Sequence, residues 1–200
     1  VDRYKLIGGV TVLSLREAGG AFTPVTYEEA LAELGDVNIT AETNANNIVT
    51  PGGMITASLD GSEAVPGLDT ATQTAFIDYM ADDGTVAARV WLTTAQALRQ
   101  RMDKVRQFAI GGVSLNDLNA RGLADGLFET IVDYRLQRPS PERATELALR
   151  WRVESANGVV QEVVTGLNEA LTVTLEAIEG NFAINVEVID GERPAAVRSG

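Results

Sequence analysis

The sequence predicts two modules, an α+β module over residues 1–137 and an all-β sandwich over residues 144–200, joined by a linker at 138–143. Pro139 and Pro141 stand within three residues of each other, and such a pair stops a helix and favours extended backbone. Before these prolines, segments with helical spacing mix with strand-like segments. After them, apolar and polar residues alternate with a period of two, which is typical of antiparallel strands that bury one face.

The amino-acid composition excludes several classes of binding partner and of catalytic site. The 200 residues include 16 Lys and Arg against 28 Asp and Glu, a net charge of −12 that argues against nucleic acid and anionic membranes as partners. No apolar run reaches the roughly 18–20 residues of a membrane span. Cys and His are absent, which excludes disulfides, Ser-His-Asp and Cys-His catalysis, and the usual zinc sites. We therefore expect no cofactor and no metal.

In the first part of the α+β module, residues 5–15 are apolar on both faces, which predicts a covered parallel strand. Thr26 and Glu29 are spaced as a capping box, and the helix that follows is expected to end at Gly35. Residues 36–74 are rich in Thr, Asn and Gly, and we expect irregular β structure and loops there.

The second part of the module begins with a predicted hairpin, formed by residues 76–80 and 86–92. Thr94 is expected to cap a helix, and residues 109–118 form a second apolar strand. The apolar positions of the two predicted helices recur at helical spacing: Leu98, Met102, Val105 and Ala109 in one, and Leu123, Leu127, Ile131 and Tyr134 in the other.

Four alternating segments follow the linker: residues 147–153, 159–164, 171–177 and 182–188. Asn157-Gly158 is a strong hairpin signal, and residues 179–181 predict another turn. The pattern resembles an immunoglobulin-like surface-protein domain, although such domains usually have seven strands. We therefore expect an unpaired strand edge, and we interpret Trp151 as a core residue.

The order of motifs in the first module resembles a known enzyme family. Gly9-Val10-Thr11-Val12-Leu13 is followed by Val25-Thr26-Tyr27-Glu28-Glu29, then by Val90-Trp91-Leu92-Thr93-Thr94, and finally by Ile110-Gly111-Gly112-Val113-Ser114. This succession, over roughly residues 4–135, resembles the C-terminal portion of family 18 glycoside hydrolases, the chitinase-like enzymes. It is most similar to the bacterial branch that acts on cell-wall or spore peptidoglycan. The resemblance implies a partial or degenerate β/α-barrel portion with an inserted α+β subdomain.

The sequence departs from that family at the positions that carry its chemistry. The family's Asp-x-x-Asp-x-Asp-x-Glu motif, whose Glu protonates the glycosidic oxygen, is absent. Leu13 stands where the family has a sugar-contacting Tyr, Thr93 and Thr94 where it has an acid pair, and Asn116 where it has a Trp. We therefore predict no catalytic residue in this chain.

Two places are candidates for ligand binding. Asn116, Asp117 and Asn119 follow a predicted parallel strand, the end at which barrel folds place function. The alternative is that these residues cap the next helix. Trp91 is a candidate sugar platform, with a core position as the alternative.

These observations favour a non-catalytic extracellular or cell-surface structural protein, self-assembling or in contact with glycan. Its expected partners are other copies of itself, other parts of a longer protein, or cell-wall glycan. The alternative is a C-terminal fragment of a chitinase-like glycoside hydrolase whose catalytic acids lie outside this chain. An Asp-x-x-Asp-x-Asp-x-Glu motif in the upstream coding sequence would favour the enzyme.

Overall fold

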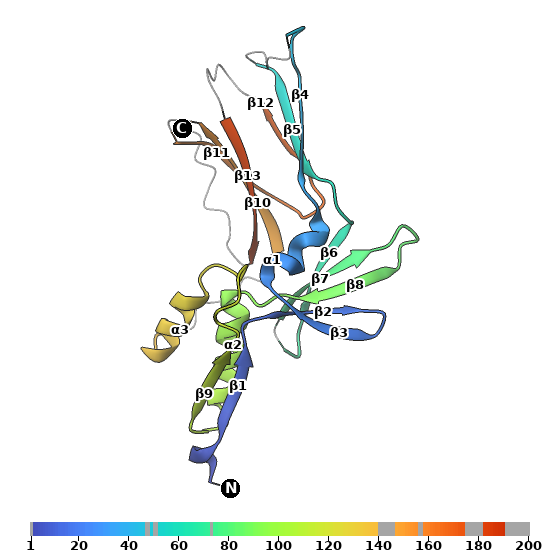
Figure 1. The fold of residues 1–200 in the computed structure, drawn as a ribbon. Coiled ribbons are helices and arrows are strands. Elements are labelled where there is room, and N and C mark those ends of the chain that lie inside the picture. The colour runs from blue at the N-terminus through green and yellow to red at the C-terminus, as the bar shows by residue number, and fades with distance from the viewer. Residues whose placement is uncertain are drawn as a thin grey trace. The chain divides into compact units, whose positions relative to one another are not determined.

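The computed structural model describes residues 2–46, 49, 52–72, 74–139, 147–155, 158–174 and 182–190. The chain divides into two compact units. Unit 1 consists of Val1–Glu33 and Val65–Glu146, and unit 2 consists of Leu34–Ala64 and Leu147–Gly200. The described residues form thirteen strands and three α-helices (Figure 1).

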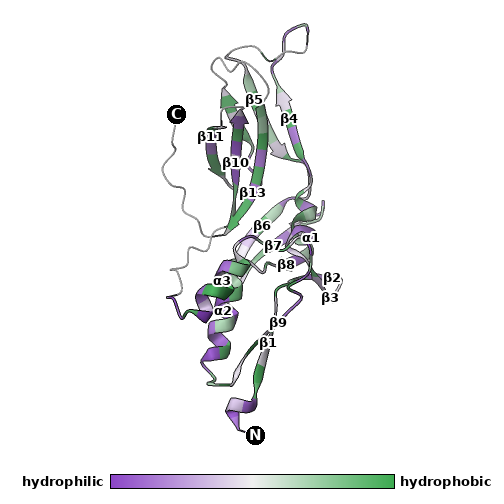
Figure 2. Cartoon of the chain, turned by 60° about the vertical axis from the view of Figure 1, so that its left-hand side comes forward, coloured by the Kyte–Doolittle hydropathy of each residue, from purple (hydrophilic) through white to green (hydrophobic). Residues whose placement is uncertain are grey.

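Unit 1 contains a parallel pair of strands, β1 (Ile7–Thr11) and β9 (Gly112–Asn116). Helices α2 (Ala95–Arg106) and α3 (Leu127–Arg135) lie side by side and pack against this pair (Figure 2). A Cβ at Gly8 would lie 2.5 Å from Val105 Cγ1, so only glycine lets α2 approach β1 this closely. The buried centre of this cluster is formed by Val10, Val12, Leu98, Met102 and Leu127.

Unit 1 also contains a five-stranded sheet in the order β3-β2-β8-β7-β6. Its strands are β2 (Ser14–Ala18), β3 (Ala21–Val25), β6 (Ala64–Asp69), β7 (Thr74–Met80) and β8 (Val86–Trp91). One face is buried through Ile77, Tyr79 and Val90. Helix α1 (Tyr27–Leu31) contacts this sheet, and the Tyr79 hydroxyl donates a hydrogen bond of 2.7 Å to the Ala30 carbonyl. Short 3-10 turns at Arg3–Lys5 and Ala32–Leu34 complete the helical segments.

Unit 2 contains two three-stranded antiparallel sheets. One has the order β11 (Gly158–Thr165), β10 (Leu147–Ser155), β13 (Phe182–Asp190). The other has the order β12 (Leu171–Thr174), β5 (Met54–Leu59), β4 (Val37–Ala41). Trp151 is fully buried, as predicted, and its Nε1 donates to Thr165 Oγ1 at 2.9 Å.

The predicted fold class, a partial or degenerate β/α-barrel portion plus an immunoglobulin-like sandwich, is wrong. Strands predominate in both units, they form four small sheets, and the described residues contain no barrel. The apolar run at 5–15 is not one strand, because the chain turns after Thr11 and places β1 and β2 in different sheets. Residues 36–74, for which we expected irregular β structure and loops, contain the regular strands β4, β5 and β6, since threonine favours extended backbone.

The second module is also built differently from the prediction for 144–200. Unit 2 takes β4 and β5 from residues 34–64, and β5 pairs with β12 from Leu171↔Ala57 to Thr174↔Met54. This pairing covers an edge that the C-terminal strands alone would leave open. Residues 140–143 of the predicted linker, Asn157 of the predicted hairpin and the predicted turn at 179–181 lie outside the described residues.

Several local predictions are confirmed. Thr26 and Glu29 form the capping box at the start of α1. Thr94 caps α2 by accepting a hydrogen bond from the Ala97 backbone N–H. The hairpin of β7 and β8 is present. Among the described helices, none has the length and apolar character needed to cross a membrane.

The Tyr79 hydroxyl generates a stability prediction. Burial, with Glu33 nearby, raises the pKa of Tyr79, which keeps the hydroxyl protonated as a donor. Tyr79→Phe leaves the Ala30 carbonyl without this partner, and we expect a loss of about 1–2 kcal/mol in the free energy of unfolding, measured by urea titration. Tyr4→Phe, at a residue that is 70% exposed, is the matched control and should change little. Equal losses in the two variants would contradict the assignment.

The capping box generates a pH prediction. The backbone N–H and hydroxyl of Thr26 both donate to Glu29 Oε2, and they hold the pKa of Glu29 below its ordinary value of 4.5. A lowered folded-state pKa gives stability that is present above pH 4.5 and is lost as the pH falls through the folded value. Glu29→Gln should therefore flatten the acid limb of the stability curve, followed by chemical denaturation from pH 6 to 3. Glu28→Gln, which leaves both Thr26 bonds in place, should retain the wild-type slope.

Candidate functional site

Polar side chains meet at the carboxyl ends of the parallel strands β1 and β9. Thr11 and Asn116 are register partners there. Thr11 Oγ1 donates a hydrogen bond of 2.8 Å to Asp117 Oδ2 and accepts one of 3.1 Å from the Leu13 backbone N–H. A Cβ at Gly9 would lie 3.9 Å from Asn116 Nδ2, so the Asn116 amide lies close to β1. Thr11 therefore lies beside Asn116 and is hydrogen-bonded to Asp117, the two residues that the sequence predicted. The sequence did not indicate Thr11 as a site residue.

Asp117 has a left-handed backbone, with φ of +67°. This conformation is uncommon outside glycine, and Asp tolerates it better than most residues. The Asp117 carbonyl accepts a hydrogen bond of 3.0 Å from the Ala120 backbone N–H, which closes a turn that also contains exposed Asn119. Helix α3 begins only at Leu127, with Gly126 as its N-cap. The alternative role of these residues as caps of the following helix is therefore wrong.

This strand-end cluster, defined as Thr11, Asn116, Asp117 and Asn119, offers hydrogen bonds but no paired acids. Asp117 supplies one exposed carboxylate, whereas ordinary glycoside hydrolysis requires two carboxyl groups across the scissile bond. Within the described residues, no group of three or more acidic side chains is arranged to hold a metal ion. Ligand binding by this cluster and the absence of catalytic residues in this chain both stay predictions.

The threonines at the family's acid positions have structural partners. Thr93 Oγ1 donates to the Leu13 carbonyl at 2.7 Å and accepts from Arg101 Nη1 at 2.7 Å. Burial lowers the pKa of Arg101. Because residue 93 is threonine, Arg101 donates to a hydroxyl here and not to a carboxylate.

Trp91 lies on a different sheet from the strand-end cluster, at the end of β8. It is partly exposed and stacks on Phe22, with ring centroids 6.0 Å apart and an interplanar angle of 29°. Trp91 is not among the buried core residues. The Arg89 guanidinium lies 5.9 Å from the Trp91 ring centroid and 4.2 Å from that of Phe76. Alternation along β7 and β8 was the signal that could have predicted that Phe76, Arg89 and Trp91 share a face, whereas Phe22 comes from β3.

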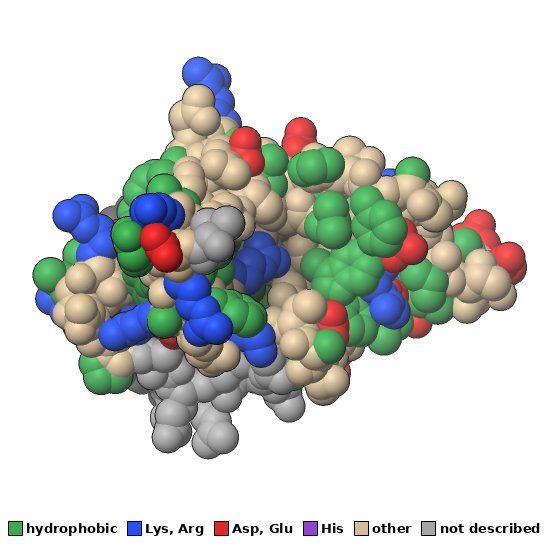
Figure 3. Space-filling model, turned by 90° about the horizontal axis from the view of Figure 1, so that it is seen from below, with side chains coloured by type: hydrophobic (Ala, Val, Ile, Leu, Met, Phe, Trp, Pro, Cys, Tyr) green, Lys and Arg blue, Asp and Glu red, His purple; other side chains and the backbone are tan. Residues whose placement is uncertain are grey.

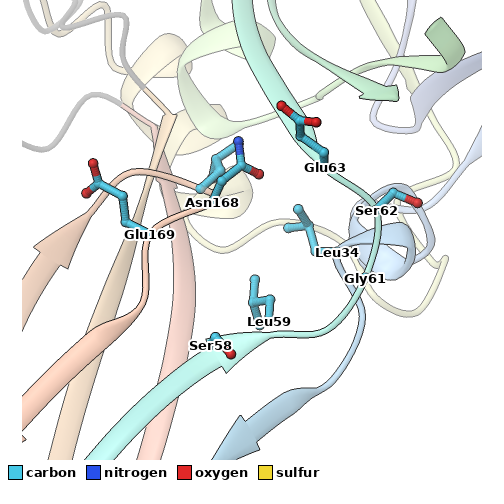
Figure 4. Close-up of a pocket in the computed structure, with 9 residues that line it drawn as sticks. Leu34, Ser58, Leu59, Gly61, Ser62, Glu63, Asn168 and Glu169 are labelled. Carbon is cyan, nitrogen blue, oxygen red and sulfur yellow. The ribbon is translucent and has the colours of Figure 1, made fainter. Parts of the chain in front are cut away.

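Unit 2 contains a pocket of about 290 Å³, which Figure 4 shows in close-up. Its lining includes two carboxylates, Glu63 and Glu169, separated in the view by Asn168. The Asn168 amide bonds both the backbone N–H and the carbonyl of Ala64 at 2.9 Å, and Glu169 Oε2 accepts from the Gly166 backbone N–H at 2.9 Å. Asn168 and Glu169 therefore hold the local backbone at the wall of this pocket.

The chain is similar in structure to solved proteins. No protein-family model and no curated protein matches the sequence. The structural neighbours of the chain are chitinases. A chitinase from Chromobacterium violaceum is similar over 69% of this chain and 35% of its own, with 19% identity and a TM-score of 0.44. A chitinase from Bacillus thuringiensis is similar over 96% of this chain and 39% of its own, with 10% identity and a TM-score of 0.37.

The turn at Asp117 leads to a prediction about stability, in which a second substitution of the same residue is the control. Asp117→Ala removes the bond to Thr11 and places alanine in a left-handed conformation, and we expect a loss of about 1–2 kcal/mol in the free energy of unfolding. Asp117→Asn keeps an oxygen acceptor and a residue that tolerates this conformation, so it should stay close to the wild type. Urea titration of both variants measures the difference. If alanine and asparagine were equally damaging, neither the turn nor the bond would explain the role of Asp117.

Proposed function

We propose that this chain is the C-terminal fragment of a chitinase-like glycoside hydrolase and that the catalytic acids lie outside its 200 residues. The observation that carries the proposal is the parallel pair of β1 and β9. A parallel sheet of two strands is too small to be stable by itself, and parallel sheets are normally covered on both faces. This pair therefore requires strands that the described residues do not supply.

The two faces of the parallel pair differ in a way that supports this proposal. Helices α2 and α3 cover the face that carries Val10. The other face carries mainly small and polar residues, including Gly9, Ser114 and Asn116, together with the exposed Ile7 at its beginning. Such a face suits the polar interior of a larger ligand-binding structure better than a dry core.

The order of elements also fits the enzyme fragment. β1 is followed by an antiparallel sheet, then by α2, and then by β9 parallel to β1. This is the succession of motifs on which the sequence resemblance to chitinase-like enzymes rests. In the proposed enzyme, the strand-end cluster binds sugar hydroxyls and an upstream glutamic acid donates the proton to the glycosidic oxygen. We propose an extracellular or cell-surface location, where such polysaccharide substrates are found.

A cleavage assay can test whether activity requires residues upstream of this chain. The 200-residue chain alone should not cleave a hexamer of β-1,4-linked N-acetylglucosamine, because it lacks the proton donor. A longer polypeptide that includes the upstream coding sequence should contain an Asp-x-x-Asp-x-Asp-x-Glu motif and cleave the hexamer, as measured by product chromatography. Replacing the motif's Glu with Gln should abolish cleavage. Turnover by the chain alone, or an upstream region without the motif, would contradict the proposal.

A second candidate function is a non-catalytic structural protein that associates with other copies of itself. The observation that favours it is the same β1–β9 pair, whose outer edges pair with no other strand among the described residues and which another copy could extend by strand addition. The net charge of −12 opposes close association of copies. Size-exclusion chromatography with light scattering separates the candidates, because a stable monomer at high concentration would remove the support for self-assembly.

A further inference from the structure

Most of the negative charge of the chain belongs to unit 2. Leu34–Ala64 and Leu147–Gly200 together contain four Lys and Arg against twelve Asp and Glu, which gives a net charge of −8 out of the −12 of the whole chain. The other twelve Lys and Arg residues belong to unit 1. Figure 3 shows basic side chains gathered on the left of the face that lies at the bottom of Figure 1. Unit 2 therefore attracts cations and repels anions.

The pocket of unit 2 has no basic residue to offset this charge. Its lining includes the carboxylates of Glu63 and Glu169 and, among the described residues, no Lys or Arg. The described arginines of unit 2, Arg150 and Arg152, are engaged elsewhere, because both form ion pairs with glutamates of β11 and β13. We therefore expect a ligand of this pocket to be a cation.

The pocket, of about 290 Å³, also has an apolar floor. Leu34 and Leu167 are each 5% exposed, and Leu59 is half-buried. Figure 4 shows the side chains of Leu34 and Leu59 extending into the space between Ser58 and Glu63. A hydrated metal ion needs oxygen ligands on several sides and would leave these leucines uncovered, whereas an aliphatic chain would remove them from water. The floor therefore favours an organic cation over a metal ion.

The segments that form the pocket are fixed to one another before any ligand binds. The Gly61 backbone N–H donates a hydrogen bond of 3.0 Å to the Leu34 carbonyl. A Cβ at Gly35 would collide with the Gly61 backbone nitrogen, so glycine is required for this close approach. The third segment is held by the two hydrogen bonds of 2.9 Å between the Asn168 amide and the Ala64 backbone. A preformed pocket loses little conformational entropy on binding.

Glu63 is the carboxylate that can pair with the ligand. It is exposed, and within the described part of the chain no hydrogen bond or ion pair engages its side chain. Glu169 differs, because its Oε2 already accepts a hydrogen bond of 2.9 Å from the Gly166 backbone N–H. An ammonium group has three N–H donors and no acceptor, so it can bond to Glu63 and to neighbouring oxygens at the same time.

We propose that this pocket binds an alkylammonium group, an aliphatic stem that ends in a primary ammonium. The stem contacts Leu34, Leu59 and Leu167, and the charge lies beside Glu63. A free alkylamine and the side chain of a lysine in a peptide both carry this group. The pocket belongs to unit 2, whereas the strand-end cluster belongs to unit 1, so the proposal goes beyond the proposed enzyme and does not rest on it.

A nuclear magnetic resonance titration of the ¹⁵N-labelled 200-residue chain with pentylammonium tests the pocket. Saturable shifts are expected at the backbone amides of residues 58–63 and 167–169. Glu63→Gln should weaken binding about fivefold, because it removes one exposed charge pair. Glu42→Gln is the matched control, since Glu42 is an exposed acid of the same unit outside the pocket lining, and it should bind as the wild type does.

Two measurements on the wild-type chain need no variant. Pentanol has the same stem without the charge and should bind at least about fivefold more weakly than pentylammonium. Raising the salt concentration from about 50 mM to about 500 mM should weaken pentylammonium binding through screening. Absence of saturable shifts at these amides, equal binding of pentanol, or equal affinities of the Glu63 and Glu42 variants would overturn the proposal.

A second titration distinguishes the two sources of the ammonium group. The probe is the tripeptide Gly-Lys-Gly, acetylated at its N-terminus and amidated at its C-terminus. Affinity about tenfold higher than that of pentylammonium indicates a lysine of a peptide as the natural ligand, and equal or lower affinity indicates a free amine. The same tripeptide with an acetylated lysine side chain should not bind, and binding of this neutral form would contradict the role of the charge. None of these outcomes bears on the cleavage assay, which tests the proposed enzyme separately.

Discussion

The packing of α2 and α3 against a single face of the β1–β9 pair is the constraint on which the rest of unit 1 depends. Val10, Leu98 and Met102 leave water together there, and burial of such side chains contributes about 1.5–3 kcal/mol each. Because Gly8 admits Val105 at close range, the helix and the strand can approach without a gap. This packing fixes the two parallel strands in register, and the register in turn brings Thr11 beside Asn116 and Asp117.

The same packing explains why the two faces of the β1–β9 pair carry different kinds of residue. The hydrophobic effect is satisfied on one face, whereas the opposite face holds glycine, serine and asparagine. A chain that needed only stability would bury both faces of a parallel pair. The face that lacks a hydrophobic covering is therefore the physical feature on which the proposal of a larger enzyme depends.

The five-stranded sheet of unit 1 has two faces of different character. The five-stranded sheet buries Ile77, Tyr79 and Val90 on one face, so the alternation of strand side chains forces Phe76, Asp78 and Trp91 onto the other. Once these residues share a face, the Asp78–Arg89 ion pair neutralises two charges among the rings. The pair also orients Arg89 flat over Phe76, which rigidifies the surface. A buried core on one face and a cluster of aromatic and charged side chains on the other are thus consequences of one strand pattern.

The sequence by itself determined the features that depend on neighbouring residues. The capping box at Thr26, the cap at Thr94 and the β7–β8 hairpin are set by short-range hydrogen bonds and spacing, and all three were predicted. The alternating pattern around Trp151 likewise identified a buried side chain. Asn116 and Asp117 could be proposed because residues that follow a parallel strand occupy a known functional position, whatever the partner strand is.

Only the tertiary structure decided which distant segments pair. Residues 34–64 belong to the same unit as the C-terminal strands because β5 pairs with β12, which lies more than a hundred residues later in the sequence. No local pattern encodes that choice, since backbone donors and acceptors are the same on every strand. For the same reason the Thr11–Asp117 bond and the grouping of Phe22 with Trp91 could not be read from the sequence. They arise from strand register, which the balance of buried area over the whole unit determines.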